Sequence, residues 1–336
     1  MNNLSHELDR ILDVLQKAKS ICIVGHVLPD GDCIGSELAM AMALKNLGKE
    51  VFCWNQDDVP EKLEFLDEEN LMRKPRRGCS FDVVLALDCA SFERMGTASS
   101  RITNRKCFIN IDHHDSNTHY ADLNWVVGES SSTGELVFQL IQRAGWEITP
   151  QIANCLFTAI STDTGSFQYR GTTPQTFAAA GKLLESGADV VSVCSEVYQS
   201  YPLARLKLLR QVLNRFKLTE DNKIAYYWLS PVDFARSGAE REDAEGLIDH
   251  IRAIDPVVVA IQFEEVSPNV IRVCMRSKNP LVDVGEVAGM FNGGGHKWAS
   301  GAVIEGTRLS VQRRVVKAVR IILRNLKKRK KEKDQP

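Results

Sequence analysis

The stretch ICIVGHVLPDGDCIGS, residues 21–36, joins a short apolar segment to a loop that carries one histidine and two aspartates. Short apolar runs of this kind are typical of parallel β-strands that are buried on both faces. Three more follow in the first half of the chain: VFCW at 51–54, VVLAL at 83–87 and FINI at 108–111. Helical patterns accompany these runs at 34–47, 132–143, 150–162 and 174–186. Together they predict the α/β class, with a doubly wound and mainly parallel sheet.

The second half of the chain has a different order of elements. Residues 189–218 have a helical pattern and predict a connector between two domains. Beyond the connector, strand and helix patterns are mixed: strands at 223–229, 257–264, 270–275 and 302–305, helices at 243–251 and 284–291, and a glycine-rich loop at 293–295. This mixture predicts a smaller α+β domain with a mixed sheet. We expect four parts, namely a first domain at 1–188, a helical linker at 189–218, a second domain at 219–312, and a basic helix and tail at 313–336.

Histidine and aspartate side chains follow the predicted strands of the first domain. His26, Asp30 and Asp32 follow the first strand, Asp88 the third, and Asp112, His113 and His114 the fourth, while Asp163 lies near the end of a helix. Any one of these residues alone is explained as well by a helix cap or an Asx turn. Because the carboxyl ends of parallel strands meet at one edge of a sheet, we expect the set to converge on one crevice.

A cluster of carboxylates with no basic side chain beside it is unfavourable unless cations neutralise it. Aspartate and histidine ligands without a thiolate favour Mn²⁺ or a similar divalent ion. The number of candidate ligands suffices for two ions that share one aspartate. Two ions about 3.5 to 4 Å apart generate a hydroxide and hold a phosphoryl group for in-line displacement. The pattern therefore predicts a two-metal site for phosphoryl chemistry.

The order of these residues resembles that of the DHH phosphoesterase superfamily, whose motif stands here as Asp112-His113-His114. The resemblance covers nearly the whole chain and continues at Gly293-Gly294-Gly295-His296. That segment is similar to the motif of the DHH-associated domain of the first type. This domain is found in bacterial oligoribonucleases that also act as 3′,5′-bisphosphate nucleotidases. The resemblance implies a DHH catalytic domain at 1–188 and a substrate-binding DHH-associated domain at 219–312.

The resemblance also implies a role for each residue. One Mn²⁺ is expected on His26, Asp30 and Asp88, and a second on Asp32, Asp88, His113 and Asp163, so that Asp88 bridges the two ions. Asp112 is expected to support an imidazole and His114 to face the phosphate, which gives both residues, with Asp88, catalytic roles. Arg276 and the segment Gly293, Gly294, Gly295 and His296 are expected to bind the substrate. Arginine offers a planar fork for phosphate, and glycine permits close approach of the backbone.

The function that the resemblance implies is Mn²⁺-dependent hydrolysis of short oligoribonucleotides to 5′ nucleoside monophosphates, by attack of a bridging hydroxide. Removal of the 3′ phosphate of 3′-phosphoadenosine 5′-phosphate is expected as well. Three enzymatic alternatives stay open: a cyclic dinucleotide phosphodiesterase of the cyclic di-AMP type, a linear dinucleotide phosphodiesterase, and a RecJ-like single-strand exonuclease. An inorganic pyrophosphatase is less favoured, because its second domain has a basic motif in place of the glycine-rich one. The non-enzymatic alternative is a nucleotide- or RNA-binding protein that uses the basic tail.

The charges of the chain are unevenly distributed, although 336 residues carry a formal net charge of only -1. From residue 313 onward, eleven basic and two acidic side chains give +9, which leaves 31 basic and 41 acidic side chains, or -10, in residues 1–312. The tail is interpreted either as a contact to nucleic acid or as a solvated helix end.

No apolar run is long enough for a membrane span. We therefore expect a soluble cytoplasmic protein with a short single-stranded RNA or nucleotide substrate and no membrane partner. A homodimer is the family tendency.

Overall fold

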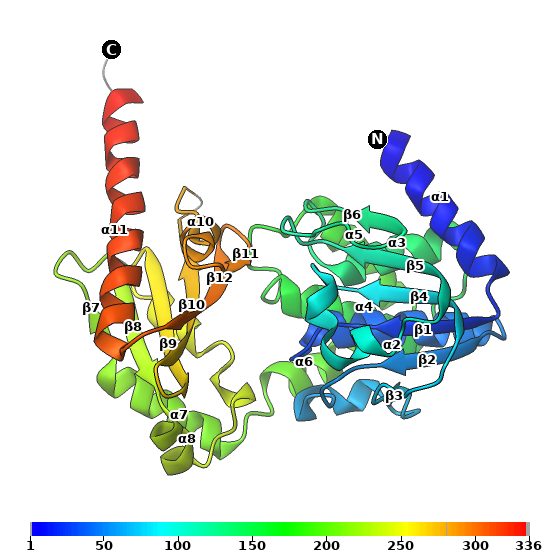
Figure 1. Ribbon diagram of the computed structural model, residues 1–336, viewed down its shortest axis with the longest axis horizontal. Helices are drawn as coiled ribbons and strands as arrows, with labels where there is room; N and C mark the ends of the chain where they lie inside the picture. The colour runs from blue at the N-terminus through cyan, green and yellow to red at the C-terminus, as the bar shows by residue number, and fades with distance from the viewer. Residues whose placement is uncertain (1, 280, 334–336) are drawn as a thin grey trace. The chain divides into compact units, whose positions relative to one another are not determined.

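The computed structural model describes the backbone of residues 2–279 and 281–333, and the side chains within 6–279 and 281–325. The chain divides into two compact units, Met1–Ser200 and Tyr201–Pro336. Each unit is built around one six-stranded sheet (Figure 1). None of the helices in the described part of the chain combines the length and the apolar character that a membrane span requires.

The sheet of the first unit is parallel throughout. Its strands are β1 (Ser20–Val24), β2 (Glu50–Trp54), β3 (Met72–Arg73), β4 (Phe81–Leu87), β5 (Arg105–Asp112) and β6 (Leu123–Val126). They lie in the order β3-β2-β1-β4-β5-β6. The order reverses between β1 and β4, and ligands of such sheets bind in the crevice beyond the carboxyl ends of the strands at this point. The predicted α/β class with a parallel sheet is confirmed.

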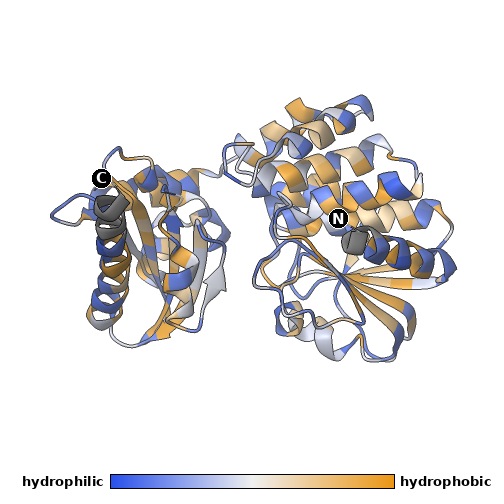
Figure 2. Ribbon diagram, turned by 90° about the horizontal axis from the view of Figure 1, so that it is seen from above, coloured by the Kyte–Doolittle hydropathy of each residue, from blue (hydrophilic) through white to orange (hydrophobic). Residues whose placement is uncertain are grey.

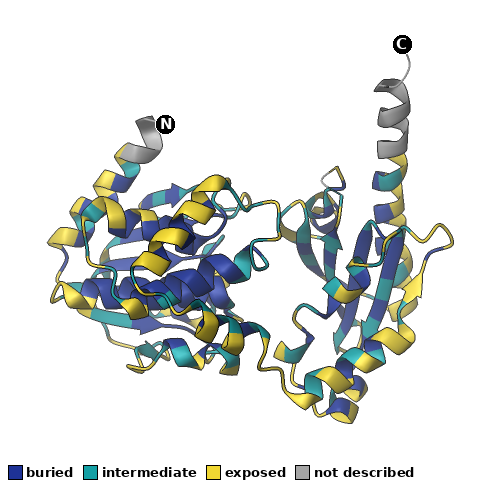
Figure 3. Cartoon of the chain, turned by 180° about the vertical axis from the view of Figure 1, so that it is seen from behind, coloured by how far each residue is buried: buried dark blue, intermediate teal, exposed yellow. Residues whose placement is uncertain are grey.

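One face of this sheet is covered by helices. The helices of the unit are α1 (Asn2–Lys17), α2 (Gly31–Asn46), α3 (Thr133–Ala144), α4 (Pro150–Asp163), α5 (Pro174–Glu185) and α6 (Val190–Tyr198). Helix α2 is buried on nearly all sides and packs closely on α4. A Cβ atom at Gly35 would lie 2.4 Å from the carbonyl oxygen of Cys155, so only glycine permits this approach. Figures 2 and 3 show the strands as mostly hydrophobic and buried, with hydrophilic and exposed surface on the outer helices.

The opposite face of the sheet packs against an aromatic cluster. The 3-10 helix η2 (Phe92–Ser100) supplies Phe92 to it, and Tyr120 comes from the loop before β6. Phe108 of β5 contacts both, with ring centroids 6.1 Å from Phe92 and 5.5 Å from Tyr120. A short 3-10 helix, η1 (Glu61–Leu66), precedes β3. Both faces of the central strands are therefore buried, as their continuous apolar runs require.

The second unit has a mixed sheet, as predicted. Its strands are β7 (Lys217–Leu218), β8 (Ile224–Leu229), β9 (Val259–Ser267), β10 (Val270–Ser277), β11 (Gly294–Gly295) and β12 (Ala299–Glu305). They lie in the order β11-β12-β10-β9-β8-β7, and β8 and β9 are parallel while the other neighbours are antiparallel. The helices are α7 (Leu203–Arg215), α8 (Pro231–Ser237), η3 (Glu242–Ala244), α9 (Leu247–Arg252), α10 (Val284–Gly289) and α11 (Arg308–Lys333). One face packs on α10 and α11, and the other packs on α7 and α9.

Local structure differs from the sequence expectation at three places. The helix expected at 243–251 is divided into η3 and α9 at Gly246, whose φ of 71° breaks the helical path. Gly294 and Gly295, expected in a loop, form a short strand that pairs with β12. Of the helices in the connector region, α6 belongs to the first unit and α7 to the second.

Candidate metal centre

His26 lies directly beyond β1, in the loop where the order of strands reverses. Its side chain is buried, with 4% of its surface exposed. The Nδ1 atom is 2.9 Å from the carbonyl oxygen of Val27, which can only accept, so Nδ1 carries a hydrogen and Nε2 is the ring nitrogen directed at the carboxylates. Nε2 lies 3.3 Å from Oδ2 of Asp88 and 3.8 Å from Oδ1 of Asp30. The imidazole is therefore oriented as a metal ligand among carboxylates.

The two aspartates that follow β1 in sequence, Asp30 and Asp32, are held by helix N-termini. Asp30 is the N-cap of α2, and its Oδ1 accepts hydrogen bonds of 3.1 Å from the backbone N–H groups of Asp32 and Cys33. The carboxylate of Asp32 accepts from the N–H groups of Thr133 at 2.7 Å and Gly134 at 2.8 Å, at the start of α3. Free N–H groups and the helix dipole favour negative charge at these positions. Both carboxylates are thereby fixed before any ligand binds.

Asp88 occupies the middle of the cluster. It directly follows β4, is 2% exposed, and has a φ of 54°, a left-handed conformation that is uncommon outside glycine. Its N–H donates to the carbonyl oxygen of Ile111 at 3.1 Å, which ties the turn to β5. One carboxylate oxygen faces His26, and the other lies 3.5 Å from Nε2 of His113 and accepts from the hydroxyl of Thr133 at 3.0 Å. A carboxylate between two imidazoles has the arrangement of a bridging ligand.

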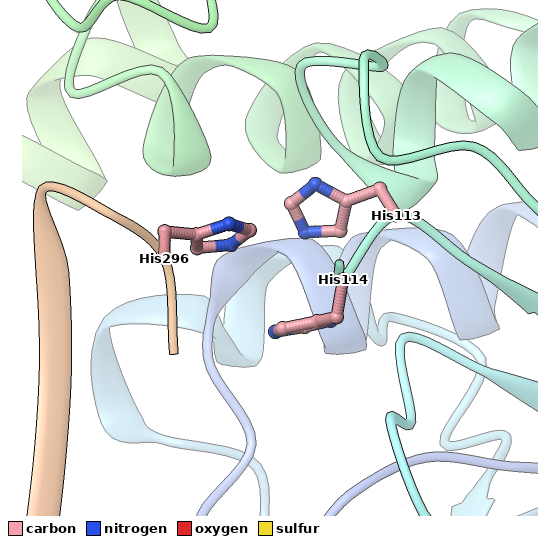
Figure 4. Close-up of side chains that lie close together, drawn as sticks. All are labelled: His113, His114 and His296. Carbon is pink, nitrogen blue, oxygen red and sulfur yellow. The ribbon is translucent and has the colours of Figure 1, made fainter. Parts of the chain in front are cut away.

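The segment Asp112-His113-His114 ends β5 and continues into the loop. Figure 4 draws the rings of His113 and His114, whose centroids lie 4.7 Å apart. Nε2 of His113 lies 3.7 Å from Oδ2 of Asp32 and 3.4 Å from Oδ2 of Asp163, the last residue of α4. Asp32, His113 and Asp163 therefore form a second group whose ligand atoms are close enough to share one ion.

Asp112 is fully buried and is directed at His114. Its Oδ1 accepts a 2.7 Å hydrogen bond from Nδ1 of His114, and its Oδ2 accepts a 2.6 Å bond from the amide of Asn117. Asp112 thus positions an imidazole beside the carboxylates of the cluster.

The electrostatics of the cluster favour bound cations. Burial raises the pKa of Asp32 well above its ordinary value, and the charges of Asp88 and Asp163 raise it further. Burial and, to a smaller extent, the charges of neighbouring carboxylates raise the pKa of Asp163 to about 6, although the charge of His113 opposes this rise. No Lys or Arg side chain within the described residues pairs with Asp30, Asp32, Asp88 or Asp163. Divalent cations supply the missing positive charge, and this oxygen and imidazole donor set fits them.

Three residues of the site were missed by the sequence reasoning. Thr133 and Gly134 bind the carboxylates of Asp32 and Asp88, and Asn117 orients Asp112. The signal for the first two was the polar run at 130–134 before a helical pattern, which is typical of a helix N-terminus. The position of Asn117 left no such signal in the sequence.

The predicted substrate-binding residues lie in the second unit. Arg276 is a half-buried residue of β10 and is paired in register with Ala299 of β12. The turn from β11 to β12 is closed by the N–H of His296, which donates to Ala299 at 2.8 Å, and the His296 ring, labelled in Figure 4, stacks on Trp298. A Cβ atom at Gly293 would lie 2.2 Å from the carbonyl oxygen of Gly301. Within this unit, Arg276 and the glycine-rich segment therefore border the same hairpin.

Known proteins match the chain over nearly its whole length. The model of the DHH family, N-terminal domain, matches residues 20–160, and the model of the DHHA1 domain matches residues 209–327. A bifunctional oligoribonuclease and PAP phosphatase NrnA from Thermus thermophilus is 34% identical over 313 residues, which cover 92% of each chain. Among solved structures, an exopolyphosphatase-related protein from Bacteroides fragilis superposes with a TM-score of 0.87 at 28% identity, covering 96% of this chain and 98% of that one.

A more distant structure shares the fold alone. RecJ from Thermus thermophilus in complex with Mn²⁺ has a TM-score of 0.53 at 14% identity, and the match covers 96% of this chain and 55% of RecJ. The expected class, a hydrolase of phosphoester bonds, agrees with the relatives and is confirmed. The chain therefore belongs to the DHH family, with a DHH N-terminal domain followed by a DHHA1 domain.

Proposed function

We propose that the chain hydrolyses short oligoribonucleotides to 5′ nucleoside monophosphates and removes the 3′ phosphate of 3′-phosphoadenosine 5′-phosphate. The observation that carries this proposal is the position of Asp88, buried between His26 and His113 at the reversal point of a parallel sheet. The name of the relative from Thermus thermophilus, bifunctional oligoribonuclease and PAP phosphatase, supports the choice of substrates.

The proposed cofactor is a pair of Mn²⁺ ions. His26, Asp30 and Asp88 would hold one ion, and Asp32, Asp88, His113 and Asp163 the other. The donor set supports Mn²⁺, because it consists of carboxylate oxygens and imidazole nitrogens. Cys33 also lies near His26 and Asp88, but its thiol faces the carboxylate of Glu37 at 3.6 Å. Bound ions would supply positive charge for the phosphoryl oxygens and lower the pKa of a water molecule.

His114 and Asp112 perform the proton chemistry in this proposal. Burial opposes protonation of His114, but the hydrogen bond and the charge of Asp112 raise its pKa to about 9. The ring therefore carries a proton on each nitrogen at neutral pH, and Nε2 would donate one to the oxygen that leaves the phosphorus. Asp112, held by Asn117, keeps the ring in the orientation that this transfer requires.

The second domain is proposed to select the nucleotide. Arg276 would bind a phosphate or a base edge through its planar guanidinium group. Gly293, Gly294 and Gly295 would let the substrate approach the backbone closely, and His296 would contact it through its imidazole. Their common border on the β11–β12 hairpin supports a shared role. The boundaries of the proposed catalytic and substrate-binding domains are 1–188 and 219–312.

The test is a substrate comparison with the full chain in the presence of Mn²⁺. Labelled RNAs of two to ten nucleotides, 3′-phosphoadenosine 5′-phosphate and cyclic di-AMP are incubated separately, and the initial rates are compared. We expect the rate to be highest on the shortest RNAs, with release of inorganic phosphate from the bisphosphate and little opening of the cyclic dinucleotide. A preference for cyclic di-AMP, or rates that increase with RNA length, would contradict the proposal.

A further inference from the structure

A groove on the second unit lies between helix α11 and the β7–β8 edge of the sheet. Its volume is about 450 Å³. Leu218, Glu220 and Tyr226 line it on the strand side. Val316 and Ile321 line it on the α11 side. Tyr226 is fixed there by Phe263, with the rings edge to face at 6.2 Å. We call this feature the α11 groove, and none of its lining residues belongs to the candidate metal centre.

Four cations of α11 line the groove: Arg313, Lys317, Arg320 and Arg324. They are separated by four, three and four residues, so they lie on one face of the helix. At 1.5 Å per residue they extend over about 16 Å along the helix axis. The groove therefore presents a row of positive charge and a tyrosine in the same lining.

These four cations differ from the other arginines of the same helix. Arg308 pairs with the carboxylate of Glu265, and Arg314 lies 5.3 Å from the ring centroid of Phe291. None of the four groove cations forms an ion pair with a carboxylate among the described side chains, and all four are exposed. Glu220 is the single acidic side chain in the described lining of the groove. The surplus positive charge is available for an anionic ligand.

We propose that the α11 groove binds single-stranded RNA, separately from the metal centre. Proteins that bind single strands without sequence preference combine a positively charged groove with an aromatic side chain for the bases. The α11 groove has both features, with cations in a row and Tyr226 in its lining. It is concave, whereas a helix that binds a membrane surface presents an apolar face outward. The basic run at 326–333 continues the same helix, but its side chains lie outside the described residues.

The test compares two charge reversals on neighbouring residues. Arg313 lines the groove and Arg314 does not, yet both are exposed and adjacent in sequence. Binding of a fluorescently labelled twelve-nucleotide poly(U) RNA to the full chain is measured by anisotropy in EDTA, which prevents hydrolysis, at about 50 to 200 mM salt. Thermal unfolding of each variant verifies that it is folded. Vesicles of phosphatidylcholine and phosphatidylserine serve as a second anionic probe.

We expect Arg313→Glu to raise the Kd for RNA by roughly fivefold or more at 0.1 M salt and to reduce the salt slope by at least about 0.7. Arg314→Glu should leave the slope close to that of the wild type, and vesicles should not bind. Equal effects of the two variants, or no effect of either, would overturn the proposal, as would binding of vesicles in preference to RNA. Hydrolysis of a dinucleotide with Mn²⁺ should be unchanged in Arg313→Glu, so the outcome is independent of the proposed catalytic function.

Discussion

Asp88 shows how a single residue combines three requirements of the site. The carboxylate is buried, faces imidazoles through both oxygens, and stands on a left-handed turn. Burial opposes its ionisation, but the hydrogen bond from His26 and the charges of the nearby histidines hold the pKa of Asp88 below its ordinary value. Asp88 is therefore a carboxylate at neutral pH. A left-handed aspartate costs about 1–3 kcal/mol and persists where the surrounding structure enforces it.

Glu37 is a second buried carboxyl group, and it predicts a pH dependence of stability. Burial raises its pKa from 4.5 to about 8, and its Oε1 atom has no hydrogen-bond partner among the described residues. Between pH 4.5 and about 8, the carboxyl group of Glu37 is protonated in the folded state and ionised in the unfolded chain. The free energy of unfolding therefore decreases as the pH rises through this range. In Glu37→Gln, which cannot ionise, this loss should be absent.

The measurement is thermal unfolding of wild type and Glu37→Gln at several pH values between 5 and 8. Wild type should lose stability relative to the variant as the pH rises, with the difference largest near pH 8. Glu50→Gln, which changes an exposed glutamate, is the control and should follow wild type. If the melting temperatures of wild type and Glu37→Gln change with pH in parallel, the carboxyl group of Glu37 ionises as it does in water, and the prediction is wrong.

At the residue level, the histidines and aspartates of the site were predictable because they stand beside strand ends in an ordered pattern. The eight side chains expected in one crevice, from His26 to Asp163, do lie close together. The residues that hold them were not predictable. Thr133 reaches Asp32 across 101 residues of sequence, a contact that exists only after the sheet and α3 have assembled. Glu37 looked like an ordinary helix residue, since nothing local indicates that α2 is buried on all sides.

At the level of elements, the site is assembled where helix N-termini meet strand ends. The start of α3 approaches Asp32 closely because residue 134 has no side chain. A Cβ atom at Gly134 would lie 2.4 Å from the Cβ of Ala159 on α4 and 3.3 Å from Oδ1 of Asp32. The packing of α3 on α4 and the hydrogen bonds to Asp32 therefore depend on the same glycine.

Gly134→Ala should move α3 away from α4 and weaken both contacts. We expect the free energy of unfolding to fall by about 1–3 kcal/mol, as for other overpacked positions. The rise in melting temperature produced by added Mn²⁺ should also become smaller. Gly181→Ala on α5 is the matched control, because a Cβ there meets nothing within 4 Å. It should be neutral or stabilise by up to about 1 kcal/mol. A Gly134→Ala variant with wild-type stability and Mn²⁺ response would contradict this account of the packing.

The elements that sequence patterns predicted are the long or fully buried ones. β1, β4 and β5 each contain a short, mostly apolar and buried run, and α3, α4 and α5 have caps and a helical period. β3 and β7 have two residues each, too few to show any period. The division of 243–251 at Gly246 depends on a single backbone angle, which no apolar pattern encodes.

For the whole molecule, the candidate ligands and the candidate substrate contacts are carried by different units. All six predicted metal ligands lie within Met1–Ser200, and Arg276 lies within Tyr201–Pro336. The uneven charge distribution is partly explained by this arrangement. The acidic surplus of residues 1–312 includes Asp30, Asp32, Asp88 and Asp163, whose charges two divalent ions would cancel. The positive charge of α11 is a separate property, which we assign to RNA binding.

The separation of the two sets predicts that substrate binding can be weakened without loss of metal. Arg276→Ala should raise the KM for a dinucleotide by roughly tenfold to a hundredfold and change kcat less. The reason is the loss of a charge-assisted hydrogen bond between the guanidinium group and the substrate. The number of Mn²⁺ ions bound should be unchanged in calorimetric titration. Arg272→Ala is the control on the same face of β10, where Arg272 lies 3.6 Å from Glu264, and it should leave KM near wild type. Equal KM values in Arg276→Ala and wild type would contradict the assignment.

The central claim, that Asp88 organises a divalent-metal site for phosphoester hydrolysis, is tested by the Mn²⁺-dependent rate of dinucleotide hydrolysis in Asp88→Asn. The substitution keeps the size of the side chain and removes its charge, so we expect the rate to fall by more than about a hundredfold. Asp58→Asn, which changes an exposed aspartate paired with Lys74, should keep the wild-type rate. Full Mn²⁺-dependent activity in Asp88→Asn, or an equal loss in Asp58→Asn, would contradict the account.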